Sequence, residues 1–193
     1  MDKIVDWVRA GQIDAAIQYT ENKLAELPET GFHQIIGKDL LHLQPILGQF
    51  LHSFFKSMRE EEELDIKAVF CEMNAFTVNY DLWFLDLFAY ETVEEEDTLN
   101  WLAEYDGQSE KSLTVTGFEA LQEVNKAYME SEGYRDDNQQ AACELHEYLV
   151  ILRLQQLFKQ TASQHKNKAT WAGIPMFVTA HDYEDMIYVV MNR

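Results

Sequence analysis

The chain has 193 residues, 47% of them hydrophobic and 12% aromatic, so it is long enough to bury a core without disulfides or metal ions. Its 34 Asp and Glu residues outnumber 15 Lys and Arg residues, and the formal net charge is −19. Such a charge repels nucleic-acid phosphates and anionic lipid headgroups, which argues against nucleic-acid and membrane partners. The charge either serves only to keep the protein soluble or attracts a basic partner.

Glycine and proline are scarce, with eight and three residues, which leaves little room for flexible linkers. We therefore expect a single globular domain over residues 1–193. The N-terminal sequence MDKIVDWVRAG lacks the basic start and apolar run of a signal peptide, and no apolar stretch is long enough to span a bilayer. Cys71 and Cys143 each lie in an apolar setting, as expected of free thiols in a reducing compartment. These features predict a cytoplasmic protein without cofactors.

Residues 2–27 have the pattern of two short helices. Gly11 would end the first helix and Pro28 would stop the second. The fragment RAGQIDAAI, residues 9–17, resembles the turn of a tetratricopeptide helical pair, in which glycine ends one helix and alanine packs the next. No second copy follows, although such arrays need several repeats for stability. We expect a helical hairpin that extends the same core.

A third helix is predicted from Pro45, because proline suits the first turn of a helix. Apolar side chains repeat from there at three- and four-residue spacing, which indicates a wide apolar face. The acidic run Glu60–Glu63 follows near the helix end, where negative charge is unfavourable against the helix dipole. We interpret the run as a solvated segment that discourages the next strand from pairing with another chain.

The stretch Asp65–Glu91 is nearly continuous in apolar residues and lies between Glu60–Glu63 and a second acidic run, Glu94–Asp97. β-Branched and aromatic residues crowd it, and polar residues near its middle suit a turn. We predict two central strands with apolar residues on both faces. The alternative is a pair of buried helices, because several apolar residues also fit helical spacing.

The segment after the central stretch is more polar. We predict a short helix at residues 95–105 and a turn-rich loop at residues 106–112. Thr116 has Glu119 three residues later, the spacing of a capping box, so we expect Thr116 to cap a helix. Another loop is expected at 133–138.

The last part predicts one long helix and a hairpin. Residues 139–164 carry a wide apolar stripe and form the longest predicted helix. Residues 174–180 and 186–191 are strand-like runs on either side of HDYED. With the central pair, at about 65–91, they make at least four strands. Hairpins without regular β–α alternation predict an α+β fold with a mainly antiparallel sheet packed with several helices.

The HDYED loop is the densest group of functional side chains: His181, Asp182, Tyr183, Glu184 and Asp185. A histidine beside carboxylates could act as a general base or help to hold a metal. The spacing matches neither a zinc motif nor an EF-hand loop, however, and acidic residues are ordinary in turns. The loop is a candidate site with no assigned metal.

The other residues that could act in catalysis are better explained by structural roles. His146 lies on the long helix, but Val150 stands where a zinc-protease helix needs its second histidine. The surroundings of Cys71 and Cys143 lack the positive charge that lowers a thiol pKa. Phosphate loops, dinucleotide fingerprints and nucleophile elbows are absent from the sequence. We therefore assign no catalytic residues and lean against an enzyme.

Our first hypothesis is a non-enzymatic protein-binding module that engages a basic protein partner. Small acidic α+β proteins without motifs resemble bacterial immunity proteins, which neutralise basic toxins, in type although not in residues. The candidate acidic surface comprises Glu60, Glu61, Glu62, Glu63, Glu94, Glu95, Glu96 and Asp97. The alternative is a small hydrolase or metal-dependent enzyme centred on His181–Asp185. A third hypothesis, a homo-oligomeric structural protein, rests on the aromatic content alone.

Overall fold

The computed structural model describes residues 2–77, 81–93 and 99–191. In this part of the chain, five α-helices accompany a six-stranded sheet, which is the predicted α+β class. The helices are α1 (Asp2–Arg9), α2 (Ile13–Ala25), α3 (Gln44–Glu60), α4 (Glu119–Glu130) and α5 (Asp137–His165). The strands are β1 (Ala68–Met73), β2 (Phe84–Tyr90), β3 (Gly107–Gln108), β4 (Leu113–Thr114), β5 (Met176–Ala180) and β6 (Tyr188–Val190).

The sheet has the order β3-β2-β1-β5-β6, and β4 also pairs with β2. The two central strands predicted within Asp65–Glu91 are β1 and β2, which pair antiparallel, so the helical alternative is wrong. The predicted C-terminal hairpin is also present, as β5 and β6. Strands β1 and β5 pair in parallel, which makes the sheet mixed although most of its pairings are antiparallel.

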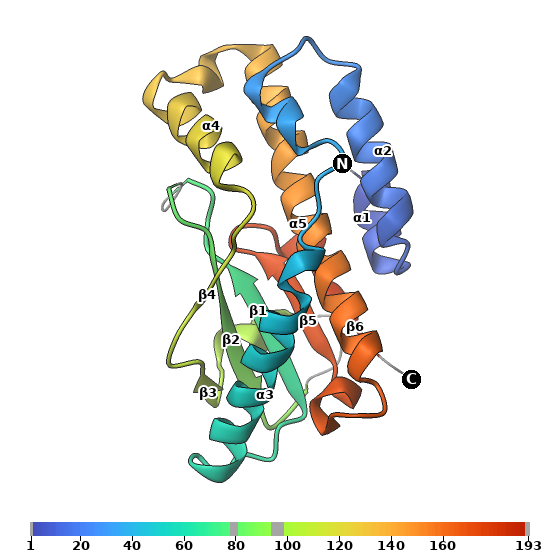
Figure 1. Ribbon diagram of the computed structural model, residues 1–193, viewed down its shortest axis with the longest axis vertical. Helices are drawn as coiled ribbons and strands as arrows, with labels where there is room; N and C mark the ends of the chain where they lie inside the picture. The colour runs from blue at the N-terminus through green and yellow to red at the C-terminus, as the bar shows by residue number, and fades with distance from the viewer. Residues whose placement is uncertain (1, 78–80, 94–98, 192–193) are drawn as a thin grey trace.

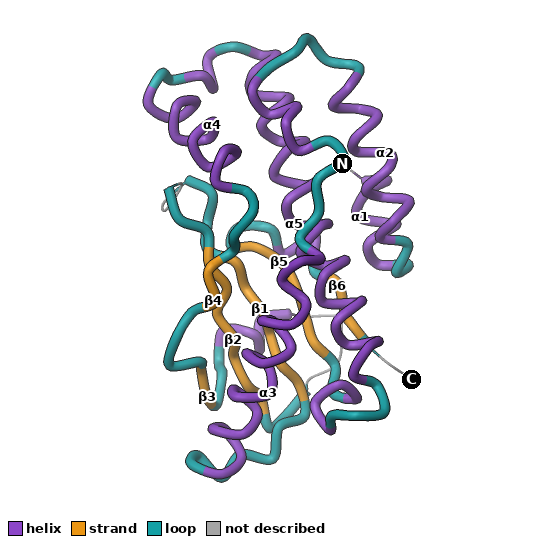
Figure 2. The backbone as a smooth tube through the Cα atoms, in the orientation of Figure 1, coloured by secondary structure: helices purple, strands orange, loops and turns teal. Residues whose placement is uncertain are grey.

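Helices α3 and α5 cover one face of the sheet, which we call the inner face (Figure 2). Helix α5 has 29 residues and packs against α2, α3, β5 and β6, which explains its wide apolar stripe (Figure 1). The inner-face side chains belong to a buried cluster that extends from Ile4 on α1 to Val190 on β6. The opposite, outer face carries a second and smaller cluster, formed by Ala68, Phe70, Tyr90, Trp101, Phe177 and Ile187.

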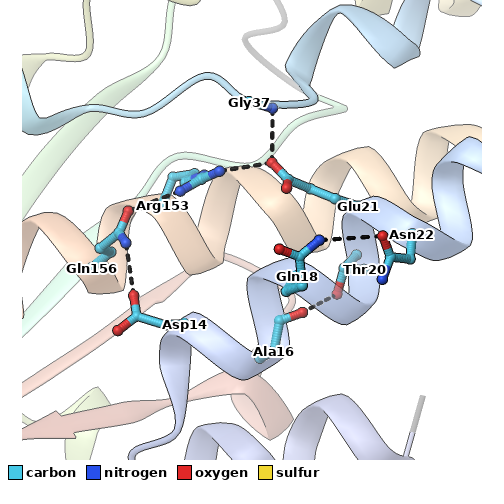
Figure 3. A network of polar contacts seen from close by, with 9 residues as sticks. All are labelled: Asp14, Ala16, Gln18, Thr20, Glu21, Asn22, Gly37, Arg153 and Gln156. Carbon is cyan, nitrogen blue, oxygen red and sulfur yellow. Dashed lines mark hydrogen bonds and ion pairs between the residues drawn. The ribbon is translucent and has the colours of Figure 1, made fainter.

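The predicted N-terminal hairpin is α1 and α2, separated at Gly11, whose φ of 69° favours glycine. Polar contacts bind α2 to α5 (Figure 3). Arg153 pairs with Glu21 at 2.7 Å, and their side chains are only 11% and 13% exposed. The Glu21 carboxylate also accepts the backbone N–H of Gly37 at 2.8 Å. These contacts join the hairpin to α5, and the buried side chains of α1 and α2 lie in the same cluster as the inner-face residues of the sheet.

Three local predictions need correction. Thr116 does not cap α4, because the N-cap is Phe118; the Glu119 carboxylate instead accepts the N–H of Gly117, where φ is +95°. The predicted loop 106–112 contains β3 and precedes β4, two-residue strands too short to show an alternating pattern. The predicted helix at 95–105 is a single 3-10 turn, Leu99–Ala103, within the described residues.

Candidate functional site

The site lies on the outer face of the sheet and follows from the alternation of side chains along β1 and β2. On β1, Phe70 and Glu72 point to the outer face, whereas the residues between and beside them point to the inner core. In the β1–β2 register, Phe70 lies opposite Phe88, and Glu72 lies opposite Asp86. Each of these two central strands therefore presents an aromatic ring, Phe70 or Phe88, beside a carboxylate on the outer face, and Tyr90 adds a second ring on β2.

The described turn Leu99–Ala103 covers part of the outer face. Trp101 on this turn packs edge-on against Tyr90, with ring centroids 4.8 Å apart, and against Phe177, at 5.3 Å. The Tyr90 hydroxyl donates a hydrogen bond of 2.6 Å to the Leu102 carbonyl. These contacts hold the turn against one end of the sheet.

Beside this cover lies a groove of about 630 Å³, which we call the outer groove. Its lining is aromatic and apolar at Phe70, Phe88, Leu102, Ala103, Tyr105 and Ile187, and ionisable at Glu72, His181 and Glu184. The rings of Phe70 and Phe88 stack with centroids 6.1 Å apart, and Tyr105 contacts Phe88 with centroids 4.9 Å apart. Among the described lining residues there is no lysine or arginine.

His181 and Glu72 form the polar centre of the outer groove. The His181 Nδ1 atom lies 3.1 Å from Glu72 Oε1, and its Nε2 atom lies 3.7 Å from Asp182 Oδ1. Burial raises the pKa of Glu72, although the hydrogen bond from His181 opposes this shift. The same hydrogen bond raises the pKa of His181 above its usual value. The pair is therefore stabilised when the imidazole is protonated and the carboxylate is ionised.

The loop that carries His181 is anchored to strand β1 and to helix α5. The His181 backbone N–H donates to the Met73 carbonyl at 2.9 Å. Asp182 adopts a left-handed conformation with φ of 69°. The Tyr183 hydroxyl donates to the Glu147 carboxylate on α5, and its ring packs edge-on against Tyr148. These contacts fix the position of His181 beside Glu72.

The five predicted loop residues thus divide by location. His181 and Glu184 line the outer groove, and Asp182 is exposed beside His181. Tyr183 is half-buried against the inner core and anchors the loop. Asp185 is exposed and lines a separate hollow beside α1 and β6.

The predicted acidic surface lies elsewhere. Glu60 ends α3, and Glu61, Glu62 and Glu63 follow it, all exposed and outside the lining of the outer groove. Glu94, Glu95, Glu96 and Asp97 lie outside the described residues. Sequence reasoning missed Glu72 and Asp86, although each is a single carboxylate within an otherwise apolar strand, which was the available signal.

The other ionisable groups considered from the sequence lie in the core. His146 is fully buried, with ring centroids of Phe32 at 4.9 Å and Trp83 at 5.8 Å, and burial lowers its pKa to about 3. The free thiols of Cys71 and Cys143 are buried as predicted, and burial raises the pKa of each. These groups are therefore neutral at pH 7.

No set of three or more His, Cys, Asp or Glu side chains could hold a metal ion within residues 2–77, 81–93 and 99–191. None of the helices described is long and apolar enough to cross a bilayer. Comparison with protein-family models, with curated proteins and with solved structures found no match to this chain. The geometry of the outer groove is therefore the basis for a functional proposal.

Proposed function

We propose that this protein is a non-enzymatic, cytoplasmic binding protein that engages a basic protein partner through the outer groove. The observation that carries the proposal is the composition of the groove, which combines an aromatic floor with the carboxylates of Glu72 and Glu184. Aromatic rings are the side chains most enriched at the centres of protein interfaces. The carboxylates select a partner that presents positive charge.

The charge of the whole chain supports the same partner. With a net charge of −19, the protein attracts a basic partner over distances set by the Debye length, about 8 Å at physiological ionic strength. Such steering raises the association rate, and it weakens as salt is added. The groove would then provide the short-range contacts. The exposed run Glu60–Glu63 remains a second predicted contact for the partner.

The test is capture of partners from the native host's lysate on the immobilised protein, with low-salt and high-salt washes. We expect one basic protein that is retained at low salt and released at high salt. A variant with Glu72→Gln and Glu184→Gln should lose it. The matched variant Glu62→Gln with Glu63→Gln removes the same charge outside the groove. Retention of the partner by this variant would assign the loss to the groove, and a loss here too would indicate a contact at the end of α3. The proposal would be contradicted if the captured protein were retained equally at low and high salt, or if no protein were retained specifically.

A second candidate function, hydrolysis with His181 as general base, is favoured by the His181–Glu72 contact, because a carboxylate that orients a histidine is a common catalytic pair. The described lining of the outer groove contains no Ser, Thr or Cys to serve as a nucleophile, so water would have to attack directly. Turnover of a panel of ester and amide substrates, abolished by His181→Ala, would establish this function. The absence of turnover would exclude it for the panel tested.

A further inference from the structure

The outer groove offers two kinds of contact that a single planar cation satisfies together. Phe70 and Glu72 are two residues apart on β1, so their side chains lie on the same face about 7 Å apart along the strand. The rings of Phe70 and Phe88 stack against each other and line the groove together with Glu72; Phe70 is buried, so Phe88 offers more of the accessible ring surface. A cation resting on these rings would reach the carboxylate with its own hydrogen-bond donors.

Negative charge around Glu72 is only partly compensated within the chain. Asp86 lies directly opposite Glu72 in the register, and Glu184 also lines the groove. The cationic group that contacts Glu72 is the imidazole of His181, which approaches one oxygen, Oε1. The Glu72 side chain is 28% exposed, so the carboxylate is accessible to an incoming group although partly desolvated. The protonated His181 side chain thus occupies a position beside Glu72 that would also suit a permanently charged cation.

We infer that the outer groove binds an arginine side chain of the basic partner, and that its guanidinium displaces His181 from Glu72. The inference rests on the proposed function and specifies its central contact. Arginine fits better than lysine because its guanidinium is planar, stacks on aromatic rings and donates two parallel hydrogen bonds to a carboxylate. The ammonium of lysine is a strongly hydrated point charge that cannot satisfy both contacts as well.

Displacement couples binding to the protonation of His181. Facing its imidazole are Glu72 of β1 and Asp182 and Glu184 of its own loop, while Asp86 of β2 acts on Glu72. A guanidinium paired with Glu72 removes the main group that favours the imidazolium and adds a positive charge beside it. Binding therefore releases a proton from His181. Affinity rises as pH increases through the titration of His181, and each unit by which binding lowers that pKa corresponds to about a tenfold difference in affinity.

The experiment follows the histidine ring signals by NMR while the pH is varied. The probes are a blocked Gly-Arg-Gly tripeptide and the same peptide with citrulline, which keeps the planar side chain but lacks its charge. We expect the arginine peptide to lower the titration midpoint of His181, and the citrulline peptide to leave it unchanged. His52, exposed on α3, is the internal control. An unchanged His181 midpoint, or an equal effect of both peptides, would overturn the inference.

Two variants separate competition from structural support. Glu72→Gln should weaken binding of the arginine peptide about tenfold or more at every pH. His181→Gln removes the competitor, so affinity near pH 6 should rise several-fold, and the part of the pH dependence that follows the titration of His181 should disappear, which leaves only the protonation of Glu72 at lower pH. If His181 merely supported the groove, its replacement would weaken binding instead, which would overturn the inference. His52→Gln is the matched control, and amide spectra establish that each variant is folded.

The two proposals fail in different ways. If a basic partner is captured equally by the native protein and by the Glu72→Gln variant, the arginine site is wrong, whereas the proposed function stands on another surface. If the arginine peptide binds as described but no basic protein is captured, the site is supported and the proposed partner is not.

Discussion

The two faces of the sheet are built from the same strands but differ in what covers them. On β1, the inner residues Val69, Cys71 and Met73 are fully buried beneath α3 and α5. The outer residue Glu72 is a partly exposed carboxylate, and the described cover on that side includes the short turn Leu99–Ala103 and Tyr105, which contacts Phe88. The larger buried cluster lies on the inner face, so we expect most of the stability to come from that side, whereas the outer face carries the ionisable side chains of the proposed binding site.

The most direct test compares one leucine from each side. Leu87→Ala removes a fully buried inner side chain and should lower the free energy of unfolding by about 2–5 kcal/mol, because a cavity remains. Leu102→Ala removes a partly buried side chain from the cover of the outer face and should cost about 1 kcal/mol or less. Urea denaturation measures both. Equal costs would show that the outer cover is as well packed as the inner core.

The two faces should also respond differently to acid, and His146 reports on the interior. Burial lowers its pKa to about 3, so the unfolded chain binds more protons than the folded chain between pH 3 and 6.5. Stability therefore falls as the pH falls through this range, by about 3 kcal/mol from this group at pH 4. His146→Leu should remove this loss, as measured by unfolding at pH 7 and pH 4. His52→Leu on the exposed surface should leave it unchanged.

The loop between β5 and β6 links the two faces, and Tyr183 is its anchor on the inner side. Tyr183→Phe removes the hydroxyl that donates a hydrogen bond to the Glu147 carboxylate. That carboxylate is largely buried, which already raises its pKa, so the loss of a donor destabilises it further. We expect a cost of about 1–3 kcal/mol in urea denaturation at pH 7. The exposed Tyr134→Phe is the matched control. A loss confined to arginine-peptide binding, with stability unchanged, would mean that Tyr183 does not hold the loop to the core.

The smallest expected effect concerns His181 on the outer face, and its sign is opposite to that of His146. The pKa of His181 is raised in the folded state, so its contribution to stability is fully present below about pH 6.5 and is lost as pH rises through the folded pKa. The side chain is 57% exposed, which limits this contribution to less than about 1 kcal/mol. The native protein should exceed His181→Gln in stability at pH 5.5 but not at pH 8.5. A difference that grows with pH would contradict the assignment.

The local pattern of the sequence predicted the main elements. Helical periodicity located α1, α2, α3 and α5, and the dense aromatic and β-branched residues of Asp65–Glu91 located β1 and β2. Glu72 on β1 and Asp86 on β2 were missed, because a single carboxylate in an apolar strand is a weak signal in a chain where carboxylates are abundant. The HDYED loop remains a predicted site, and the sequence did not indicate that His181 contacts Glu72, which is 109 residues away.

The sequence by itself indicated which segments are buried, because the spacing of apolar residues shows which face of each helix and strand packs against its neighbours. It also determined the net charge, which belongs to composition alone. The tertiary structure decided the parallel pairing of β1 with β5, the two-residue strands β3 and β4, and the meeting of His181 with Glu72. These features depend on contacts between distant segments, and the free energy of such contacts is set by the whole fold and not by any local pattern.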